Sequence, residues 1–364
     1  MTDPDRSPWR SVRQVALFLA ALYLFFISID LMSAAFRMAG TDFARQLITT
    51  ASDPIAGLLI GFLTTSLVQS SSCTTSIVVG LVAAGALPLR LAVPIVMGAN
   101  IGTTITATIV SFGHVTHPRE FEKAFSAATV HDFFNILAVA VLLPIEVLFH
   151  PVEHLAVFFE GIFSGIGGLQ LASPLKAVVT PVTELVTGII PWVIPLLIIA
   201  ITALFFALSR MVRIMRTAVL TRVEVLFDRV LFRNDTASFT LGMTLTALVQ
   251  SSSATTSLVV PLVGTGVLTL RKIFPYTLGA NVGTTITAIL ASLATGNRIA
   301  VEVALAHLSF NALGIAIFYP LRALPIWIAT QAGRFASRTR RNTIFLVMGY
   351  VALDILIILY LFLR

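Results

Sequence analysis

A long internal repeat constrains this chain more than any other feature of its sequence. When the sequence is shifted by 181 residues, Gln69 aligns with Gln250, and about 29 of the 47 positions in 65–111 are identical to those in 246–292 without a gap. LVQSSSCTTSIVV in the first half corresponds to LVQSSSATTSLVV in the second, and GANIGTTITA corresponds to GANVGTTITA. We therefore predict one structural unit that the chain uses twice.

The composition indicates a membrane protein. Of the 364 residues, 57% are hydrophobic and only 11% are charged, with a mean hydropathy of +0.95, whereas soluble domains carry about 25% charged residues. So few charges cannot cover a surface in water, so we expect a lipid bilayer around an all-α polytopic bundle. The net charge of +7 does not indicate a nucleic-acid partner, because the basic residues lie in short loops between apolar segments.

Seven apolar stretches are long enough to cross a bilayer as helices. They cover about 12–36, 90–112, 121–149, 190–210, 271–295, 299–320 and 342–363. Lys and Arg gather in alternate loops, and the positive-inside rule then places the N-terminus in the cytoplasm and the C-terminus outside. This arrangement inserts the second half in the opposite orientation to the first, so we predict two inverted-topology repeats in the cell inner (plasma) membrane.

The apolar segments on either side of each Gln-Ser-Ser-Ser motif are too short to span. Pro54–Val68 has 15 residues, which is about 22 Å of helix against a hydrocarbon core of about 30 Å. Because this polar break recurs in both halves, we predict a re-entrant helical hairpin with QSSS at its tip in each repeat. The alternative is one spanning helix with a polar patch at its helix contacts.

The repeat sets the predicted organisation of the chain. The prediction comprises a first inverted repeat at 1–150 (hairpin about 54–88), an outer connecting segment at 151–189, a second inverted repeat at 190–320 (hairpin about 236–268), and a basic cytoplasmic segment with one extra terminal transmembrane helix at 321–364.

The predicted tips carry groups that suit an anion and a small cation. Helix ends at mid-membrane present unpaired N–H groups with a partial positive charge, and serine hydroxyls add rotatable donors. Neutral oxygens suit a hard cation, which offsets the cost of burying an anion. We expect the anion at Ser70, Ser71, Ser72, Ser251, Ser252 and Ser253. We expect the cation at Gln69, Gln250, Asn100, Thr103, Thr104, Asn281, Thr284, Thr285 and Asp132.

Glycines flank the asparagine of each GAN-x-GTT motif, at Gly98, Gly102, Gly279 and Gly283. Glycine permits non-helical backbone, so we predict a broken helix opposite each hairpin tip. Close packing between two helices is the alternative role for these glycines.

Asp132, His131 and His307 lie within predicted membrane helices. Asp132 follows His131, and an intramembrane acid is functional by default. Its counterpart in the repeat is Leu308, so at most one half uses it. His131 corresponds to His307, but no metal-ligand cluster surrounds either, so we expect packing or capping roles for both and no bound metal beyond the transported cation.

Five segments carry a resemblance to a known family. They are GFLTTSLVQSSSCTTSIVV, VPIVMGANIGTTITATIVS and FEKAFSAATVHDFFNILAVAVLLPIE in the first half, and LVQSSSATTSLVVPLVGTGVLTL and FPYTLGANVGTTITAILASLA in the second. They resemble the type II sodium–phosphate cotransporter family from about Val15 to Tyr319. The resemblance implies sodium-driven symport of inorganic phosphate by an elevator-like motion, with phosphate and Na⁺ bound at the QSSS tips and Na⁺ as coupling ion rather than a cofactor. A homodimer is compatible with this reading.

Three other functions are weighed against this one. A carrier for another oxyanion, or one driven by protons, stays open. A membrane hydrolase is disfavoured because Ser70–Ser72 and His131 lie on separate segments with no nucleophile elbow. A channel is disfavoured because two inverted hairpins that meet at mid-membrane favour alternating access. Within the family pattern, His117 stands where electrogenic vertebrate members carry an aspartate, which leaves the cation stoichiometry open.

Overall fold

The computed structural model describes residues 8–51, 53–103, 105–226 and 234–363, and every regular element among them is helical. The first part of the chain forms α1 (Pro8–Ala51), α2 (Pro54–Val68), α3 (Ser71–Ala83), α4 (Leu89–Gly102), α5 (Ile105–Ser111), the short 3₁₀ helix η1 (Phe112–His114), α6 (Pro118–Phe149), α7 (Pro151–Gly165) and α8 (Gly168–Ile189). The second part forms α9 (Val193–Leu226), α10 (Asp235–Val249), α11 (Ser252–Gly264), α12 (Leu270–Thr295), α13 (Arg298–Phe318), α14 (Ala323–Arg338) and α15 (Arg340–Leu363).

Seven helical stretches in the described part of the chain are long and apolar enough to cross a membrane. They are Val12–Ala51, Leu89–His114, Pro118–Phe149, Val193–Thr217, Leu270–Thr295, Arg298–Phe318 and Arg340–Leu361. Each contains most or all of one predicted span, so the seven predicted helices are confirmed in length and composition. The chain is an all-α membrane protein.

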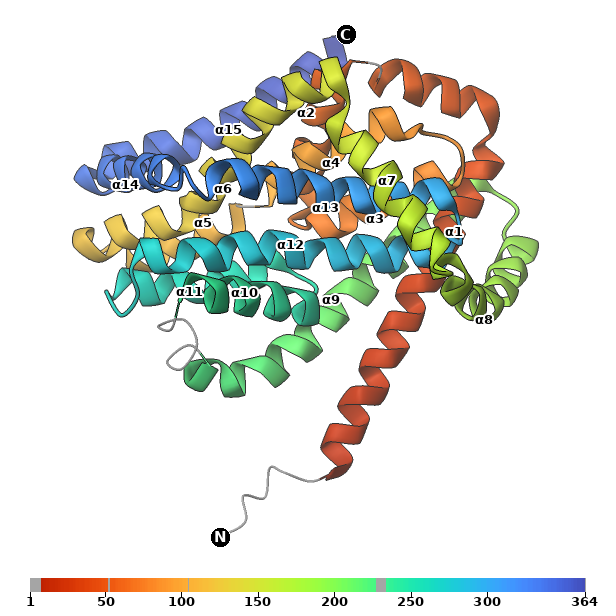
Figure 1. Ribbon diagram of the computed structural model, residues 1–364, viewed down its shortest axis with the longest axis horizontal. Helices are drawn as coiled ribbons and strands as arrows, with labels where there is room; N and C mark the ends of the chain where they lie inside the picture. The colour runs from red at the N-terminus through yellow and green to blue at the C-terminus, as the bar shows by residue number, and fades with distance from the viewer. Residues whose placement is uncertain (1–7, 52, 104, 227–233, 364) are drawn as a thin grey trace.

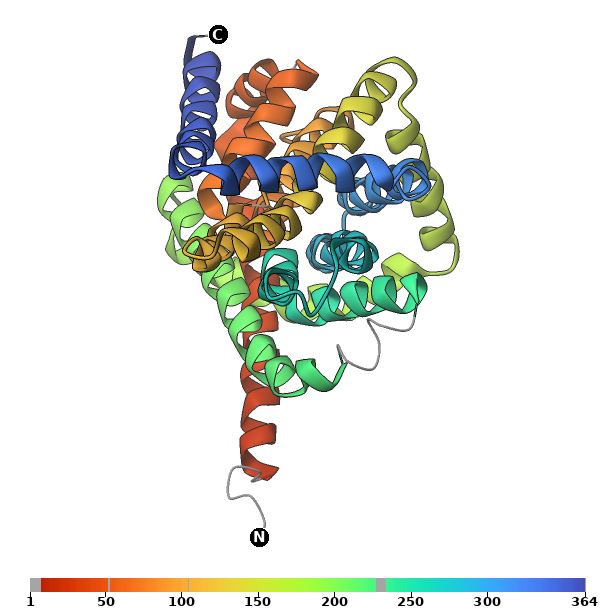
Figure 2. The ribbon, with the colours of Figure 1, turned by 90° about the vertical axis from the view of Figure 1, so that its left-hand side faces the viewer.

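The first helix is longer than its apolar sequence predicts. α1 continues beyond the predicted end near residue 36 to Ala51, with a kink at Gly40, where φ is 81°. Glycine adopts this left-handed backbone at little cost, so it joins two helical segments at an angle. The N-terminal part of α1 extends away from the rest of the molecule in both views (Figures 1 and 2).

The two segments outside the repeat are also helical. The connecting segment forms α7, which contacts α13, and α8, which contacts α1. The basic segment after α13 forms α14, which packs along α6. This contact is close because it contains Gly333, where a Cβ would lie 2.4 Å from the carbonyl oxygen of Glu122.

Helix α2 packs on α4, and α10 packs on α12 (Figure 1). Glycines of both partners lie at each contact. A Cβ at Gly61 would lie 1.9 Å from the carbonyl oxygen of Ile95, and a Cβ at Gly98 would lie 1.9 Å from that of Leu58. Small residues thus let two backbones touch, as they do at many membrane helix contacts.

The predicted helix break is wrong in the second half. α12 runs without interruption over Leu270–Thr295. Its Gly279 instead packs on α10, where a Cβ would lie 2.0 Å from the carbonyl oxygen of Phe239. In the first half α4 ends at Gly102 and α5 begins at Ile105, but Thr104 between them lies outside the described residues, so the break there stays a prediction. Close packing, the alternative role, therefore accounts for the glycine in α12.

Aromatic packing joins α6 to α12 and α13. Phe134 of α6 is fully buried. Its ring meets that of Phe274 on α12 at 6.2 Å and that of Phe318 on α13 at 6.4 Å, both edge to face. These contacts hold α6, from the first repeat, against two helices of the second.

Candidate functional site

Both Gln-Ser-Ser-Ser motifs form a turn of the same geometry between two short helices. Gln69 ends α2 with φ of 57°, and Ser70 is extended and caps the start of α3 with its side chain. Gln250 ends α10 with φ of 60°, and Ser251 caps α11 in the same way. We call Gln69–Ser70 the first turn and Gln250–Ser251 the second turn. A left-handed glutamine is uncommon and strained, so its occurrence at two equivalent positions points to function.

A threonine pair closes each turn. The hydroxyls of Thr65 and Thr74 are 2.8 Å apart and link α2 to α3. The hydroxyls of Thr246 and Thr255, at the equivalent positions, are 2.7 Å apart and link α10 to α11. All four side chains are buried, so these bonds fix the helix ends that carry the turns.

The two motifs meet in the interior of the protein. The hydroxyl of Ser72, near the N-terminus of α3, donates to the carbonyl oxygen of Gln250 at 3.3 Å. The hydroxyl of Ser253, near the N-terminus of α11, donates to the carbonyl oxygen of Thr103 at 3.0 Å. Residues 178 and 150 positions apart in sequence are therefore in contact at one site.

The two glutamine side chains are held in the same way. Thr106 donates to Oε1 of Gln69 at 2.9 Å, and Thr287 donates to Oε1 of Gln250 at 2.7 Å. Each Nε2 donates to the backbone carbonyl three residues earlier. An amide oxygen has two lone pairs, and the threonine hydroxyl occupies one of them on each glutamine oxygen.

A pocket of about 430 Å³ lies against both turns. Its lining comes from three places: the end of α2 with the first turn, the second turn, and one face of α9. The lining residues are Val68, Gln69, Ser70, Phe205, Leu208, Ser209, Val212, Arg213, Arg216, Thr217, Gln250 and Ser251. Donor groups, amide oxygens and two guanidinium groups thus share one cavity.

Arginines were not expected at this site. The sequence places Arg213 and Arg216 more than 30 residues before the second turn, in a basic run that looks like an ordinary cytoplasmic loop. A local signal does exist, because Phe205, Ser209 and Val212 precede them at helical spacing and define one face of α9. Nothing in that pattern says which other segment the face covers.

The structure separates the described site residues that the sequence predicts into three groups. The pocket lining includes Gln69, Ser70, Gln250 and Ser251. The buried starts of α3 and α11 hold Ser71, Ser72, Ser252 and Ser253. Within the described residues, the lining of this pocket does not include Asn100, Thr103, Asn281, Thr284, Thr285 or Asp132. Thr104 lies outside the described residues, and the cation role of all these residues stays a prediction.

The asparagines of the GAN motifs belong to a buried hydrogen-bond network. Nε2 of His131 lies 2.5 Å from Oδ1 of Asn281, and Nε2 of His307 lies 3.1 Å from Oδ1 of Asn100. Asn135 accepts from Nδ2 of Asn281 at 2.8 Å and donates to the carbonyl oxygen of Asn100 at 3.0 Å. Both histidines are buried, as a packing role requires, and each also bonds the asparagine of the other half.

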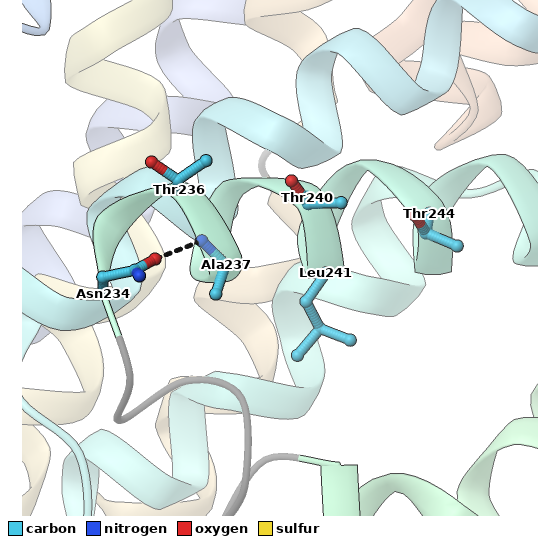
Figure 3. Close-up of a pocket in the computed structure, with 6 residues that line it drawn as sticks. All are labelled: Asn234, Thr236, Ala237, Thr240, Leu241 and Thr244. Atoms are coloured by element: carbon cyan, nitrogen blue, oxygen red, sulfur yellow. Dashed lines mark hydrogen bonds between the residues drawn. The ribbon is translucent and has the colours of Figure 1, made fainter.

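A second pocket, of about 500 Å³, lies along α10 (Figure 3). The residues that line it come from this helix and its cap, and they are Asn234, Thr236, Ala237, Thr240, Leu241 and Thr244. Oδ1 of Asn234 accepts from the Ala237 amide at 2.7 Å, which is an ordinary helix cap. This lining contains no ionisable side chain, so the pocket against the two turns is the better candidate site.

Comparison with known proteins identifies the family. The model of the Na+/Pi-cotransporter family matches residues 24–170 and 203–332. The chain belongs to this family. The family model covers both QSSS motifs, both GAN-x-GTT motifs and the α9 arginines, and it confirms the resemblance found in the sequence. No solved structure matches the chain.

Curated relatives agree with the family assignment. The chain is 32% identical over 437 residues to "Sodium-dependent phosphate transport protein 2B" of Homo sapiens, an alignment that covers 93% of this chain and 63% of the relative. It is 33% identical over 413 residues to "Sodium-dependent phosphate transport protein 2A" of Mus musculus, covering 90% of this chain and 64% of the relative. The chain thus spans less than two thirds of the length of these relatives. They are transport proteins, which argues against the enzyme alternative.

Proposed function

We propose that this protein is a sodium-coupled symporter of inorganic phosphate in the plasma membrane. The observation that carries the proposal is that the two repeated turns, from opposite halves of the chain, open onto one pocket that also holds two arginines. Two helix starts and two guanidinium groups favour an anion. The names of the relatives supply phosphate and sodium.

Phosphate is proposed to bind between the first and second turns. The hydroxyl oxygens of Ser70 and Ser251 accept from backbone amides at 3.2 Å, so their protons remain available to donate to a phosphate oxygen. The buried Ser72 and Ser253 instead hold the two halves together. Sodium is proposed to bind next to the anion, where the remaining lone pairs of the Gln69 and Gln250 oxygens coordinate it and its positive charge offsets the cost of burying the anion.

The depth proposed for the two turns in the membrane rests on the position of the pocket along α9. Its candidate span is Val193–Thr217, and the pocket lining runs from Phe205, in the middle of this span, to Thr217 at its end. This stretch is about 18 Å of helix. The proposal therefore places both turns near the bilayer midplane as tips of re-entrant hairpins, in repeats of inverted orientation, with the pocket open toward one side.

The side of the membrane to which the pocket is proposed to open rests on the charge of the loops. The end of α9 that carries Arg213 and Arg216 is the basic end, which the positive-inside rule assigns to the cytoplasm. The pocket would then face the cytoplasm, with the N-terminus on the same side and the C-terminus outside. Alternating access requires a second state in which the turns open to the other side, as expected for two hairpins that meet at mid-membrane.

Uptake into liposomes tests the proposal. Purified protein is reconstituted, and entry of radiolabelled phosphate is compared under inward gradients of NaCl, of KCl and of protons, with protein-free liposomes as control. We expect phosphate uptake to require the sodium gradient, and to be inhibited more by unlabelled phosphate than by sulfate or a dicarboxylate. Uptake that follows the proton gradient alone, or stronger inhibition by another anion, would contradict it.

A further inference from the structure

Helix α9 presents two arginines to the pocket from one face. Arg213 and Arg216 are three residues apart, so their side chains lie next to each other on the helix surface. Both line the pocket and both are exposed. They belong to neither repeat motif.

The pocket changes in character along its length. At its inner end Gln250 is 4% exposed, and Gln69, Ser70 and Ser251 are half-buried. At its outer end Arg213 and Arg216 are exposed. The cavity therefore leads from the two turns to a positively charged mouth.

No described acid neutralises this mouth. Among the described residues the lining contains no Asp or Glu, and the arginines that form ion pairs elsewhere in the described part of the chain are those at positions 298, 322 and 334. Two guanidinium groups without a described carboxylate partner attract anions, and the planar fork of arginine matches the oxygens of a phosphate.

We propose that Arg213 and Arg216 form an anion-collecting mouth, which binds phosphate transiently between the two turns and the end of α9. The inference rests on the proposed function and deepens it, because it names residues outside the repeat that set the apparent affinity for phosphate on one side of the membrane. They act on access to the site, whereas the turns hold the substrate.

The chain contains a matched control on the same helix. Arg210 is one turn before Arg213, and its guanidinium carbon lies 5.2 Å from the ring centre of Phe206. Arg210 does not line the pocket. Its replacement by glutamine removes the same charge from the same helix without changing the mouth.

The test measures transport from each side of reconstituted liposomes. The double variant Arg213→Gln/Arg216→Gln is compared with wild type, with the single variant Arg216→Gln, with the charge-conserving Arg213→Lys/Arg216→Lys and with Arg210→Gln, each checked by gel filtration for a monodisperse fold. Half-saturating phosphate concentration and maximal rate are measured for sodium-dependent uptake and for efflux, at low and high ionic strength.

We expect the double glutamine variant to raise the half-saturating phosphate concentration about tenfold on the arginine side only, with the maximal rate retained. The lysine variant should recover most of this loss, Arg216→Gln should show a smaller shift in the same direction, and Arg210→Gln should match wild type. High salt should weaken phosphate binding to wild type more than to the glutamine variant.

The outcomes separate the two proposals. If wild type transports phosphate and the double glutamine variant keeps the wild-type half-saturating concentration on both sides, the arginine mouth is refuted and the proposed function stands. An equal rise of the half-saturating phosphate concentration in Arg210→Gln would also refute the arginine mouth, because the effect would then come from the charge of α9 in general. If wild type transports no phosphate, the proposed function fails and the mouth fails with it.

Discussion

His131 on α6 bonds Asn281 on α12, across the boundary between the two halves of the chain. Its Nε2 lies 2.5 Å from Oδ1 of the asparagine, and because an amide oxygen only accepts, Nε2 carries the proton. The repeat-related histidine, His307, makes the reciprocal bond to Asn100. Each half thus supplies the donor for the asparagine side-chain oxygen of the other.

Removal of a histidine from this network should destabilise the protein. His131→Ala leaves a buried oxygen of Asn281 unpaired, at a cost of about 1–3 kcal/mol, so the melting temperature in detergent should fall. His131→Gln keeps a hydrogen-bond donor, so its melting temperature should fall less. His154→Ala, at an exposed position on α7, is the control and should melt like wild type. Equal melting of His131→Ala and His154→Ala would show that the cross-half bond does not stabilise the fold.

The glycine contacts predict a sharp contrast between two alanine variants. Gly98→Ala places a Cβ 1.9 Å from the carbonyl oxygen of Leu58, and the resulting overpacking should cost about 1–3 kcal/mol or more. Gly161 on α7 has nothing within 4 Å of an added Cβ, so Gly161→Ala should be neutral or slightly stabilising. Thermal unfolding in one detergent compares them. A Gly98→Ala variant as stable as wild type would mean that α2 and α4 do not pack this closely.

The sequence predicts the helices well and their contacts less well. The length of the apolar stretches predicts the seven spans, and the polar break predicts where α2 ends and α3 begins. The glycines of GAN-x-GTT are ambiguous, because the same residue serves a helix break or a close helix contact. The choice depends on a neighbour such as Phe239, which lies far away in sequence. α12 therefore continues where a break was predicted.

The candidate site shows the same limit. Repetition alone identifies Gln69 and Gln250 as a pair, because their motifs recur. It does not identify Arg213, which has no repeat motif and reaches the pocket only through the packing of α9. The bond between His131 and Asn281 was missed for a related reason, since it crosses between halves and the repeat alignment compares each residue with its counterpart rather than with its contact.

The left-handed turns allow a test of the glutamine side chains that leaves the backbone in place. Glycine adopts φ near 60° easily, so Gln250→Gly should keep the second turn while it removes the amide that Thr287 contacts. We expect sodium-dependent phosphate uptake to fall at least tenfold, with little change in melting temperature because relief of strain offsets the lost hydrogen bond. Gln69→Gly should behave alike. Wild-type uptake by both variants would remove these side chains from the site.

The ion pair at the start of α10 predicts a pH effect. The hydrogen bond from Arg322 is the main reason that the pKa of Asp235 is lowered, and Tyr319 donates to the same oxygen at 2.9 Å. A lowered pKa gives stability that is present above the unfolded value of about 3.9 and is lost as the pH falls through the folded value. Asp235→Asn should therefore melt below wild type at neutral pH, and the difference should narrow in acid.

The control for this pH effect is Asp42→Asn, which removes an exposed carboxylate from α1. The partners of Asp235 are themselves partly exposed, so the expected difference is small. A difference between wild type and Asp235→Asn that stays constant from neutral pH to well below 3.9 would exclude the ion pair as its source.

Equilibrium binding tests the central claim, that the pocket between the two turns holds phosphate together with sodium. Radiolabelled phosphate is bound to purified wild type and Gln250→Gly in NaCl and in choline chloride of equal ionic strength. The account predicts saturable binding to wild type in NaCl, far weaker binding in choline chloride, and loss of the sodium-dependent part in the variant. Equal binding in both salts, or unchanged sodium-dependent binding in the variant, would contradict it.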